Sequence, residues 1–188
     1  MLGYKVAKND DVRVVVTLFI STSAQTNVNR SSVMVKETAK HRANKALVLE
    51  IQDSEGKYYD SAVSFNFPEK SLTYKVGETV TEPCFDTDLE VVCGEGIHFF
   101  LTRSTAEQYG LSSVQNGVCK SYYDNGINHE LGTFKDGKKH GLFQRWFENG
   151  QMDGEATYVN GLRHGLYKRW NPEGICIDKA KYVNGEQN

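Results

Sequence analysis

The heptapeptide HGLFQRW, residues 140–146, returns as HGLYKRW at residues 164–170, 24 positions further along the chain. A catalytic side chain is needed once in a site, whereas a packing side chain is needed in every copy of a structural unit. The duplication therefore predicts a repeated building unit in this part of the chain and not a reaction centre.

Glycines keep the same period on both sides of the heptapeptides. Their spacing alternates between 11 and 13 residues, which gives a 24-residue unit of two unequal halves, at Gly126, Gly137, Gly150, Gly161, Gly174 and Gly185. All but Gly174 follow Asn or Asp, and such pairs supply the two positive-φ positions of a type I′ turn. Each half is predicted to be a short strand that ends in a tight turn. Because a lone hairpin is marginal, the hairpins are expected to stack.

The strands between these turns carry aromatic residues, which favour β-structure. The apolar positions shared by the two heptapeptides are expected to pack against neighbouring strands of the repeat. Most of each tryptophan side chain is expected to be buried. The shared apolar positions are Leu142, Phe143 and Trp146 in the first copy and Leu166, Tyr167 and Trp170 in the second.

Two arginines recur beside the tryptophans. Strand alternation places Arg145 on the face opposite Trp146, and Arg169 on the face opposite Trp170. Arginine is favoured in contact patches because its planar fork bonds carboxylates and stacks on aromatic rings. Arg145 and Arg169 are therefore predicted to belong to a protein-docking face.

Composition narrows the class of protein. The 188 residues are 39% hydrophobic and 24% charged, as in a soluble globular chain, and the net charge of -2 argues against nucleic acid as a partner. The longest apolar run, Val14–Ile20, is shorter than the roughly 18 residues that span a bilayer. The first residues lack a basic region followed by an apolar run, so no transmembrane segment and no secretion are expected.

The four cysteines do not form a recognisable metal motif. A zinc site from Cys84, Cys93, His98 and Cys119 is conceivable, but the ligands are not paired at the two-to-four-residue spacing of structural zinc sites. We expect reduced thiols and no metal. No GxSxG, P-loop or HExxH motif is present, so no catalytic residue and no cofactor are expected either.

The region before the repeats reads differently. Segments such as VRVVVTLFI (12–20) and KALVLEIQD (45–53) are predicted strands, and STAEQYG (104–110) a short helix capped by Ser104. The polar segment 21–44 holds four Lys or Arg and a single Glu, and we interpret it as a solvated or partner-bound loop.

The repeats resemble a known family. FKDGKKHGLFQRWFENG (134–150) and YVNGLRHGLYKRWNPEG (158–174) are similar to the MORN repeat, in the variant of bacterial YwqK-like proteins, over about residues 121–188. The resemblance implies an elongated stack of β-hairpins that serves as an interaction or assembly module. Some MORN proteins contact lipid headgroups, but residues 121–188 contain nine Lys or Arg and nine Asp or Glu, so membrane contact is not expected here.

A second resemblance covers residues 74–110. It is to an uncharacterised domain of amoeba-infecting large DNA viruses, of the mimivirus and marseillevirus kinds, where it is often joined to repeats. The matching residues are Tyr74, Val76, Gly77, Phe85, Asp86, Cys93, Gly96, Ile97, His98, Phe99, Phe100, Ala106 and Tyr109. The resemblance implies a giant-virus protein that resides in the virion or the host cytoplasm.

An enzyme is the alternative interpretation. GEGIHFFLTRSTAEQY (94–109) is similar to a segment of ADP-ribosyltransferases in which Gly-Ile-Tyr-Phe precedes a helix. Here His98 replaces the family's tyrosine, and no Glu-x-Glu motif follows. The competing interpretation makes Ile97, Phe99 and Phe100 core residues and His98 a hydrogen-bonded neighbour.

Together these observations predict a mainly β protein. We expect an α+β domain over residues 1–115 and a stack of MORN-like hairpins over residues 116–188. The expected function is that of a non-enzymatic structural or interaction protein, plausibly a minor capsid component, whose partners are other proteins. Self-association is a further possibility.

Overall fold

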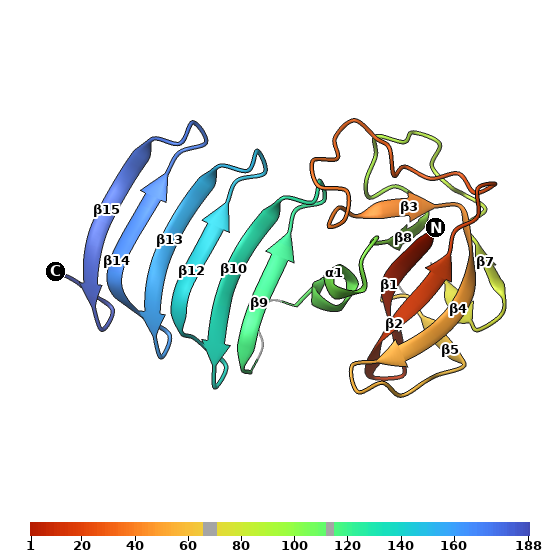
Figure 1. Ribbon diagram of the computed structural model, residues 1–188, viewed down its shortest axis with the longest axis horizontal. Coiled ribbons are helices and arrows are strands. Elements are labelled where there is room, and N and C mark those ends of the chain that lie inside the picture. The colour runs from red at the N-terminus through yellow and green to blue at the C-terminus, as the bar shows by residue number, and fades with distance from the viewer. Residues whose placement is uncertain (66–70, 112–114) are drawn as a thin grey trace. The chain divides into compact units, whose positions relative to one another are not determined.

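The computed structural model describes residues 1–65, 71–111 and 115–188, and the chain divides into two compact units. Unit 1 comprises Met1–Tyr109 together with Asp124–Gly126, and unit 2 comprises Gly110–Tyr123 and Ile127–Asn188. Each unit is built on antiparallel strands, and the single helix among the described residues has six residues (Figure 1). The predicted mainly β fold class is confirmed.

Unit 1 contains a six-stranded sheet and a two-stranded sheet. The strand order of the larger sheet is β6-β5-β1-β2-β4-β7, and β3 pairs with β8 in the smaller one. The elements are β1 (Leu2–Asn9), β2 (Val12–Phe19), β3 (His41–Ala43), β4 (Lys45–Asp53), β5 (Ser61–Val63), β6 (Thr73–Lys75), β7 (Thr79–Thr81), β8 (Ile97–Phe99) and α1 (Arg103–Gln108).

The larger sheet of unit 1 must curl. Its two edge strands, β6 and β7, are consecutive in the chain and are joined only by Val76–Glu78. Four Cα steps cover at most about 14 Å, whereas the edges of a flat sheet of this size lie about 24 Å apart. The curl encloses a core of apolar side chains that includes Val16, Leu18, Val48 and Tyr74, all fully buried.

The short sheet and the helix complete unit 1. Ile97 and Phe99 of β8 and the following Phe100 are buried, which confirms that they belong to the core. Helix α1 begins after Thr102, whose side chain accepts a hydrogen bond from the Thr105 amide, so the predicted cap at Ser104 is wrong by two positions. Thr102 ends the preceding extended segment, and its hydroxyl lies three residues before the amide that needs an acceptor.

The interpretation of residues 21–44 as a solvated or partner-bound loop is wrong for the residues that are buried in unit 1, whereas most of residues 21–40 form turns with exposed or partly exposed side chains. Arg30, His41 and Arg42 are at most 4% exposed. The Arg42 guanidinium donates to the carbonyls of Asp86, Asp88 and Glu95 at 2.6–3.0 Å. Backbone carbonyls satisfy a buried guanidinium without a carboxylate, and such partners leave no trace in the charge pattern of a sequence.

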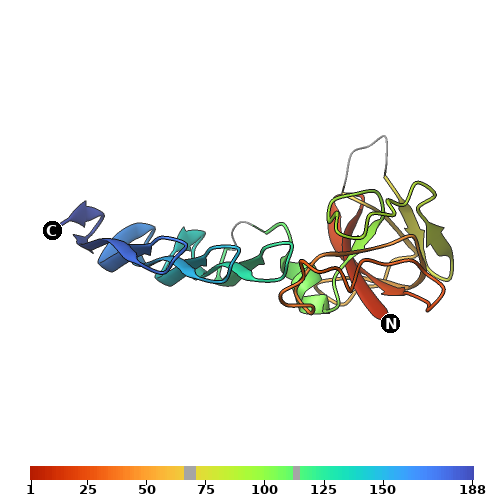
Figure 2. The same ribbon diagram turned by 90° about the horizontal axis from the view of Figure 1, so that it is seen from above.

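Unit 2 is a single antiparallel sheet. Its strand order is β11-β10-β12-β13-β14-β15-β16, and β9 pairs with β10. Figure 2 shows these strands as one layer, with no helix of the unit on either face. The strands are β9 (Gly117–Tyr122), β10 (Asn128–Lys135), β11 (Lys138–Lys139), β12 (Gly141–Trp146), β13 (Met152–Val159), β14 (Leu162–Trp170), β15 (Cys176–Val183) and β16 (Glu186–Gln187).

Two kinds of turn alternate along this sheet, which explains the unequal halves of the repeat. All six turn glycines have positive φ, between 71° and 93°. At Gly137, Gly161 and Gly185 the preceding residue also has a φ of about 51°, as in a type I′ turn. At Gly126, Gly150 and Gly174 only the glycine has positive φ, so these wider turns are not the predicted type I′ turns. The Asn or Glu before them keeps an ordinary conformation because a wider loop needs one left-handed residue.

Neighbouring strands in unit 2 interlock by pairing a ring with a position that has little or no side chain. The Phe143 ring covers Gly132, where an added Cβ would lie 2.2 Å from Phe143 Cε1. One repeat later, Tyr167 lies opposite Ala156. Phe143 is 5% exposed even though the sheet has a single layer, because the adjacent strand leaves room for its ring.

We expect Gly132→Ala to lower the free energy of unfolding of unit 2 by about 1–3 kcal/mol, because the added methyl group displaces the Phe143 ring. Urea denaturation followed by tryptophan fluorescence measures this change, since both tryptophans, Trp146 and Trp170, lie in unit 2. Gly154→Ala is the matched control. Its Cβ meets nothing closer than 3.4 Å, so a change below about 1 kcal/mol is expected. Equal losses in both variants would contradict the interlock.

Candidate functional site

One face of the repeat sheet carries two ladders of aromatic rings, and we call it the aromatic face. Residues 24 positions apart occupy equivalent places, so Phe134, Tyr158 and Tyr182 form one ladder and Phe143 and Tyr167 the other. Rings of the two ladders contact edge to face: the centroids of Phe143 and Tyr158 lie 5.3 Å apart, and those of Tyr167 and Tyr182 lie 6.0 Å apart. Such contacts stabilise aromatic pairs beyond the area they bury.

A cation lies over the rings in each repeat. Lys139 Nζ is 4.4 Å from the centroid of Phe143, and the Arg163 guanidinium is 4.5 Å from that of Tyr167. Lys139 is neutralised by Glu130, with an N–O distance of 3.3 Å. Arg163 occupies the equivalent place one repeat later, but the residue equivalent to Glu130 is Gly154. No carboxylate among the described residues pairs with Arg163.

Hydrogen bonds to tyrosine hydroxyls hold Arg163 in place of a carboxylate. The pKa of Arg163 is raised mainly by its hydrogen bond with Tyr158, with a further contribution from Tyr182. Its Nη1 donates to Tyr182 Oη at 3.4 Å. A guanidinium that stacks on rings and bonds only neutral groups keeps a full positive charge for a ligand.

Arg145 and Arg169 converge on a shared carboxylate. Arg145 Nε lies 2.5 Å from one oxygen of Asp153, and Arg169 Nε lies 3.6 Å from the other. The Asp153 side chain is only 11% exposed, whereas the two arginine side chains are about half exposed. Arg145 is thus hydrogen-bonded to a buried anion, Arg169 forms a longer ion pair with the same anion, and the rest of each guanidinium faces solvent.

A bulge puts Asp153 between the two arginines. In the β12–β13 pair, Arg145 lies opposite Gly154 and Trp146 lies opposite Met152, so Asp153 is an extra residue without a partner. A bulge turns the extra side chain toward the face of its neighbour. The next bulge, in β15, has Ile177 at the equivalent position. In the repeats that the structure describes, the pairing of two arginines with one aspartate therefore occurs only at Asp153.

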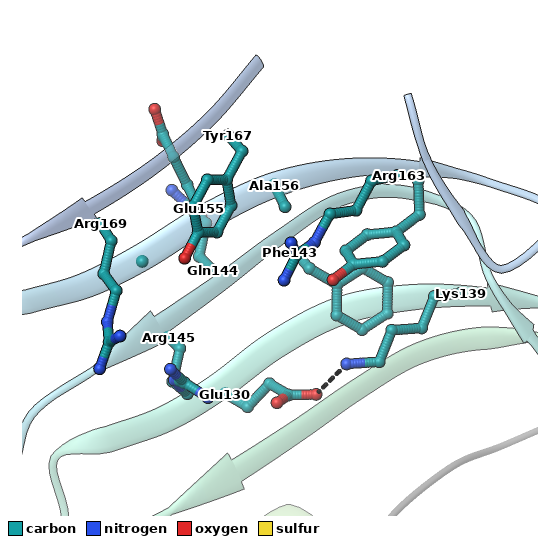
Figure 3. A pocket seen from close by; sticks show the side chains of 12 residues that line it. Glu130, Lys139, Phe143, Gln144, Arg145, Glu155, Ala156, Arg163, Tyr167 and Arg169 are labelled. Atoms are coloured by element: carbon teal, nitrogen blue, oxygen red, sulfur yellow. Dashed lines mark hydrogen bonds and ion pairs between the residues drawn. The ribbon is translucent and has the colours of Figure 1, made fainter. Parts of the chain in front are cut away.

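These side chains surround a hollow of about 100 Å³ (Figure 3). Phe143 and Tyr167 lie on its floor, Lys139 and Arg163 at one end, and Arg145 and Arg169 at the other. The arrangement suits a chain segment that carries acidic and apolar groups, because rings and guanidinium groups alternate along the face. It offers no nucleophile paired with a base.

The predicted site residues separate into two faces. Arg145, Arg169, Phe143 and Tyr167 lie together on the aromatic face. Leu142 and Leu166 alternate to the opposite face and are 49% and 42% exposed, so the expectation that they pack the repeat is wrong. The reason is that the sheet has one layer, which leaves the second face without a covering element. Trp146 and Trp170 alternate to the same face as these leucines and are partly buried.

Sequence reasoning missed three members of the site. Lys139 and Arg163 recur at the 24-residue spacing, so the period itself was a usable signal. Asp153 has no such signal, because the equivalent positions hold His129 and Ile177. The cysteines once considered as zinc ligands are free thiols, and the described residues contain no group of three or more His, Cys, Asp or Glu side chains suited to a metal.

We expect Asp153→Asn to lower the free energy of unfolding by about 1–3 kcal/mol, because it leaves two guanidiniums without their buried anion. Urea denaturation followed by tryptophan fluorescence checks this value. Asp178→Asn is the matched control, since Asp178 lies exposed opposite Arg169 on β15 and exposed pairs contribute at most about 1 kcal/mol. If Asp178→Asn costs as much as Asp153→Asn, the pairing of two arginines with Asp153 is not the cause.

Comparison with known proteins assigns both parts of the chain. The MORN repeat variant matches residues 115–136 and 139–160, which identifies this part of unit 2 as an interaction module. The hairpins continue beyond these matches to Gln187. Among the described residues no helix is long and apolar enough to cross a membrane. No curated protein and no solved structure matches the chain. Residues 1–106, more than half of the sequence, match the family of unknown function DUF5758, and the chain therefore belongs to this family.

Proposed function

We propose that the chain is a non-enzymatic docking protein whose aromatic face binds an acidic segment of a partner protein. The observation that carries the proposal is the pair Arg145 and Arg169, held half exposed by the one buried carboxylate of Asp153. Arginines that bracket aromatic rings are typical of the centre of protein interfaces.

The charge of the aromatic face supports an acidic partner. Four cations line or border the hollow: Lys139, Arg145, Arg163 and Arg169. Glu130 neutralises Lys139, while Asp153 is shared between two arginines. Glu155, which also lines the hollow, is paired with Lys168 at 3.0 Å. The cations therefore exceed the available carboxylates, although residues 121–188 contain equal numbers of acidic and basic residues.

Preorganisation also supports docking at this face. A long, flexible side chain loses rotamer freedom when it binds, at a cost of about 0.5–1.5 kcal/mol. Arg145 and Arg169 have already lost part of that freedom to Asp153, and Arg163 is held by the rings of Tyr167 and Tyr182. The guanidinium nitrogens that are not engaged in these contacts remain able to donate two hydrogen bonds to one carboxylate, as arginine commonly does.

We further propose that the partner is another protein of a virus particle. This finer proposal rests on the resemblance of residues 74–110 to a domain of amoeba-infecting large DNA viruses. Mass spectrometry of purified particles tests it by measuring whether the chain is present in stoichiometric amounts with the shell proteins. Absence from particles of a virus that encodes the chain would overturn the viral-particle assignment and leave the docking face untouched.

Binding of a fluorescent peptide of alternating Glu and Tyr residues, followed by anisotropy, tests the docking face. We expect the double variant Arg145→Gln, Arg169→Gln to bind this peptide at least about tenfold more weakly than the unchanged protein, because each charge-assisted contact contributes about 1.5–3 kcal/mol. A peptide of alternating Lys and Tyr should bind neither protein.

The matched control is Lys179→Gln with Lys181→Gln. These lysines are exposed and pair with Lys168 and Leu166, which places them on the opposite face. The control removes the same charge and should leave binding unchanged. Equal losses in both double variants would reduce the effect to net charge and contradict the docking face. Sedimentation of both variants distinguishes self-association, which would shift with the arginines in the absence of peptide.

A further inference from the structure

Unit 1 contains a cavity of about 200 Å³ that the docking function does not use. Its walls come from three strands and the loop before β8, and its polar lining includes Lys5, Tyr74, Glu82, Cys93 and His98. All of these residues belong to unit 1. The volume corresponds to a few water molecules or to a small organic molecule, at about 30 Å³ for each water.

Lys5 is a charged residue on the core face of the curled sheet. Alternation along β1 puts it on the same face as the fully buried Ala7, and its partner on β2 is the fully buried Val16. Lys5 is 8% exposed, and its one hydrogen bond goes to the carbonyl of His98 at 3.4 Å. An ammonium has three donors, and no carboxylate among the described residues pairs with this one.

Tyr74 supplies a second unused donor beside Lys5. It is fully buried on β6, and its hydroxyl has no hydrogen-bond partner among the described residues. Lys5 Nζ lies 5.8 Å from the centroid of its ring. A buried hydroxyl without a partner costs about 1–3 kcal/mol, so this hydroxyl and the ammonium of Lys5 at one cavity point to a ligand that accepts from both.

Two further cations, Lys40 and Arg42, act on the groups at the cavity in addition to Lys5. Burial, together with a smaller contribution from the nearby Lys40, lowers the pKa of Lys5 to about 8. Burial also lowers the pKa of His98 to about 3, with contributions from Lys40, Lys5 and Arg42. His98 is therefore neutral at pH 7, and its Nε2 donates to the carbonyl of Val92 at 3.1 Å.

We propose that this cavity binds a small carboxylic acid as its anion, with the Lys5 ammonium and the Tyr74 hydroxyl donating to the carboxylate. A monoanion suits the site better than phosphate, because Glu82 also lines the cavity and repels a second negative charge. The apolar part of the acid would lie against Leu72, the aliphatic residue of the lining. A metal or a cation is disfavoured by Lys5 itself.

Differential scanning calorimetry of the full chain with sodium butyrate tests the proposal. At pH 7 we expect the Tm of unit 1 to rise saturably over concentrations up to about 50 mM, because a ligand of the native state stabilises it by mass action. Sodium chloride at equal ionic strength should give no saturable rise, and sodium phosphate a smaller one than butyrate. In NMR spectra, butyrate should shift the signals of His98 and leave those of His129 and His164 in unit 2 unchanged.

The pH dependence gives an independent readout. Binding needs the protonated amine of Lys5 and the ionised carboxylate, so affinity should be complete between about pH 6 and 7 and fall about tenfold for each unit above the pKa of about 8. Of the other groups at the cavity, Tyr74 has a raised pKa and His98 remains neutral from pH 7 upward. Between pH 7 and 9.5, deprotonation of Lys5 is therefore expected to weaken binding.

Two variants decide between a ligand site and a water-filled cavity. Tyr74→Phe removes only the unpaired hydroxyl, so it should fold normally and bind butyrate at least about fivefold more weakly. Lys5→Met should raise the Tm without ligand and abolish the butyrate effect, whereas the exposed Lys75→Met should change neither. A cavity that holds only water would give no saturable shift with butyrate in the unchanged protein, and that result overturns the proposal. So does a butyrate shift that survives in Tyr74→Phe and Lys5→Met alike.

Discussion

The contact between the Phe143 ring and the bare backbone of Gly132 is the constraint on which the repeat sheet depends. A single layer of strands has no second layer to cover its aromatic side chains, so each ring must be buried by the strand beside it. A small residue on that strand makes this possible, first as Gly132 and then as Ala156. Once the rings are buried against the neighbouring strands, Lys139 and Arg163 stack on them, and the aromatic face acquires its alternation of rings and cations.

Three buried or half-buried cations of this protein are compensated in different ways. Arg42 gives its donors to backbone carbonyls of the loop before β8 and thereby fixes that loop. The Arg163 guanidinium stacks on aromatic rings and donates hydrogen bonds to tyrosine hydroxyls. Among the residues that the structure describes, Lys5 has a single long hydrogen bond. The first arrangement satisfies both terminal nitrogens of the guanidinium and leaves Nε without a partner among the described residues, the second leaves a charge at the surface, and the third leaves a charge inside the core.

The sequence predicted the structure where a residue type recurs at the spacing of the repeat. The 24-residue period predicted the strands and turns of unit 2, the partition of Arg145 from Trp146 and the positive φ of the turn glycines. Asp153 could not be predicted, because a bulge rather than a repeated residue places it between the arginines. In unit 1 the sequence predicted strands but not the curl of the sheet that they form. The burial of Lys5 and Arg42 could therefore not be predicted. Both depend on partners 44 to 93 positions away.

The alternation of tight and wide turns has a consequence for how such a sheet changes in length. One tight and one wide turn return the chain to the same direction, and 24 residues later every side chain occupies the same face. An in-frame duplication of one such unit therefore lengthens the sheet without disturbing a neighbour. Insertion of a single residue within a strand would instead exchange the two faces from that point onward. A sheet built in this way tolerates the gain or loss of a whole 24-residue unit better than the gain or loss of part of one.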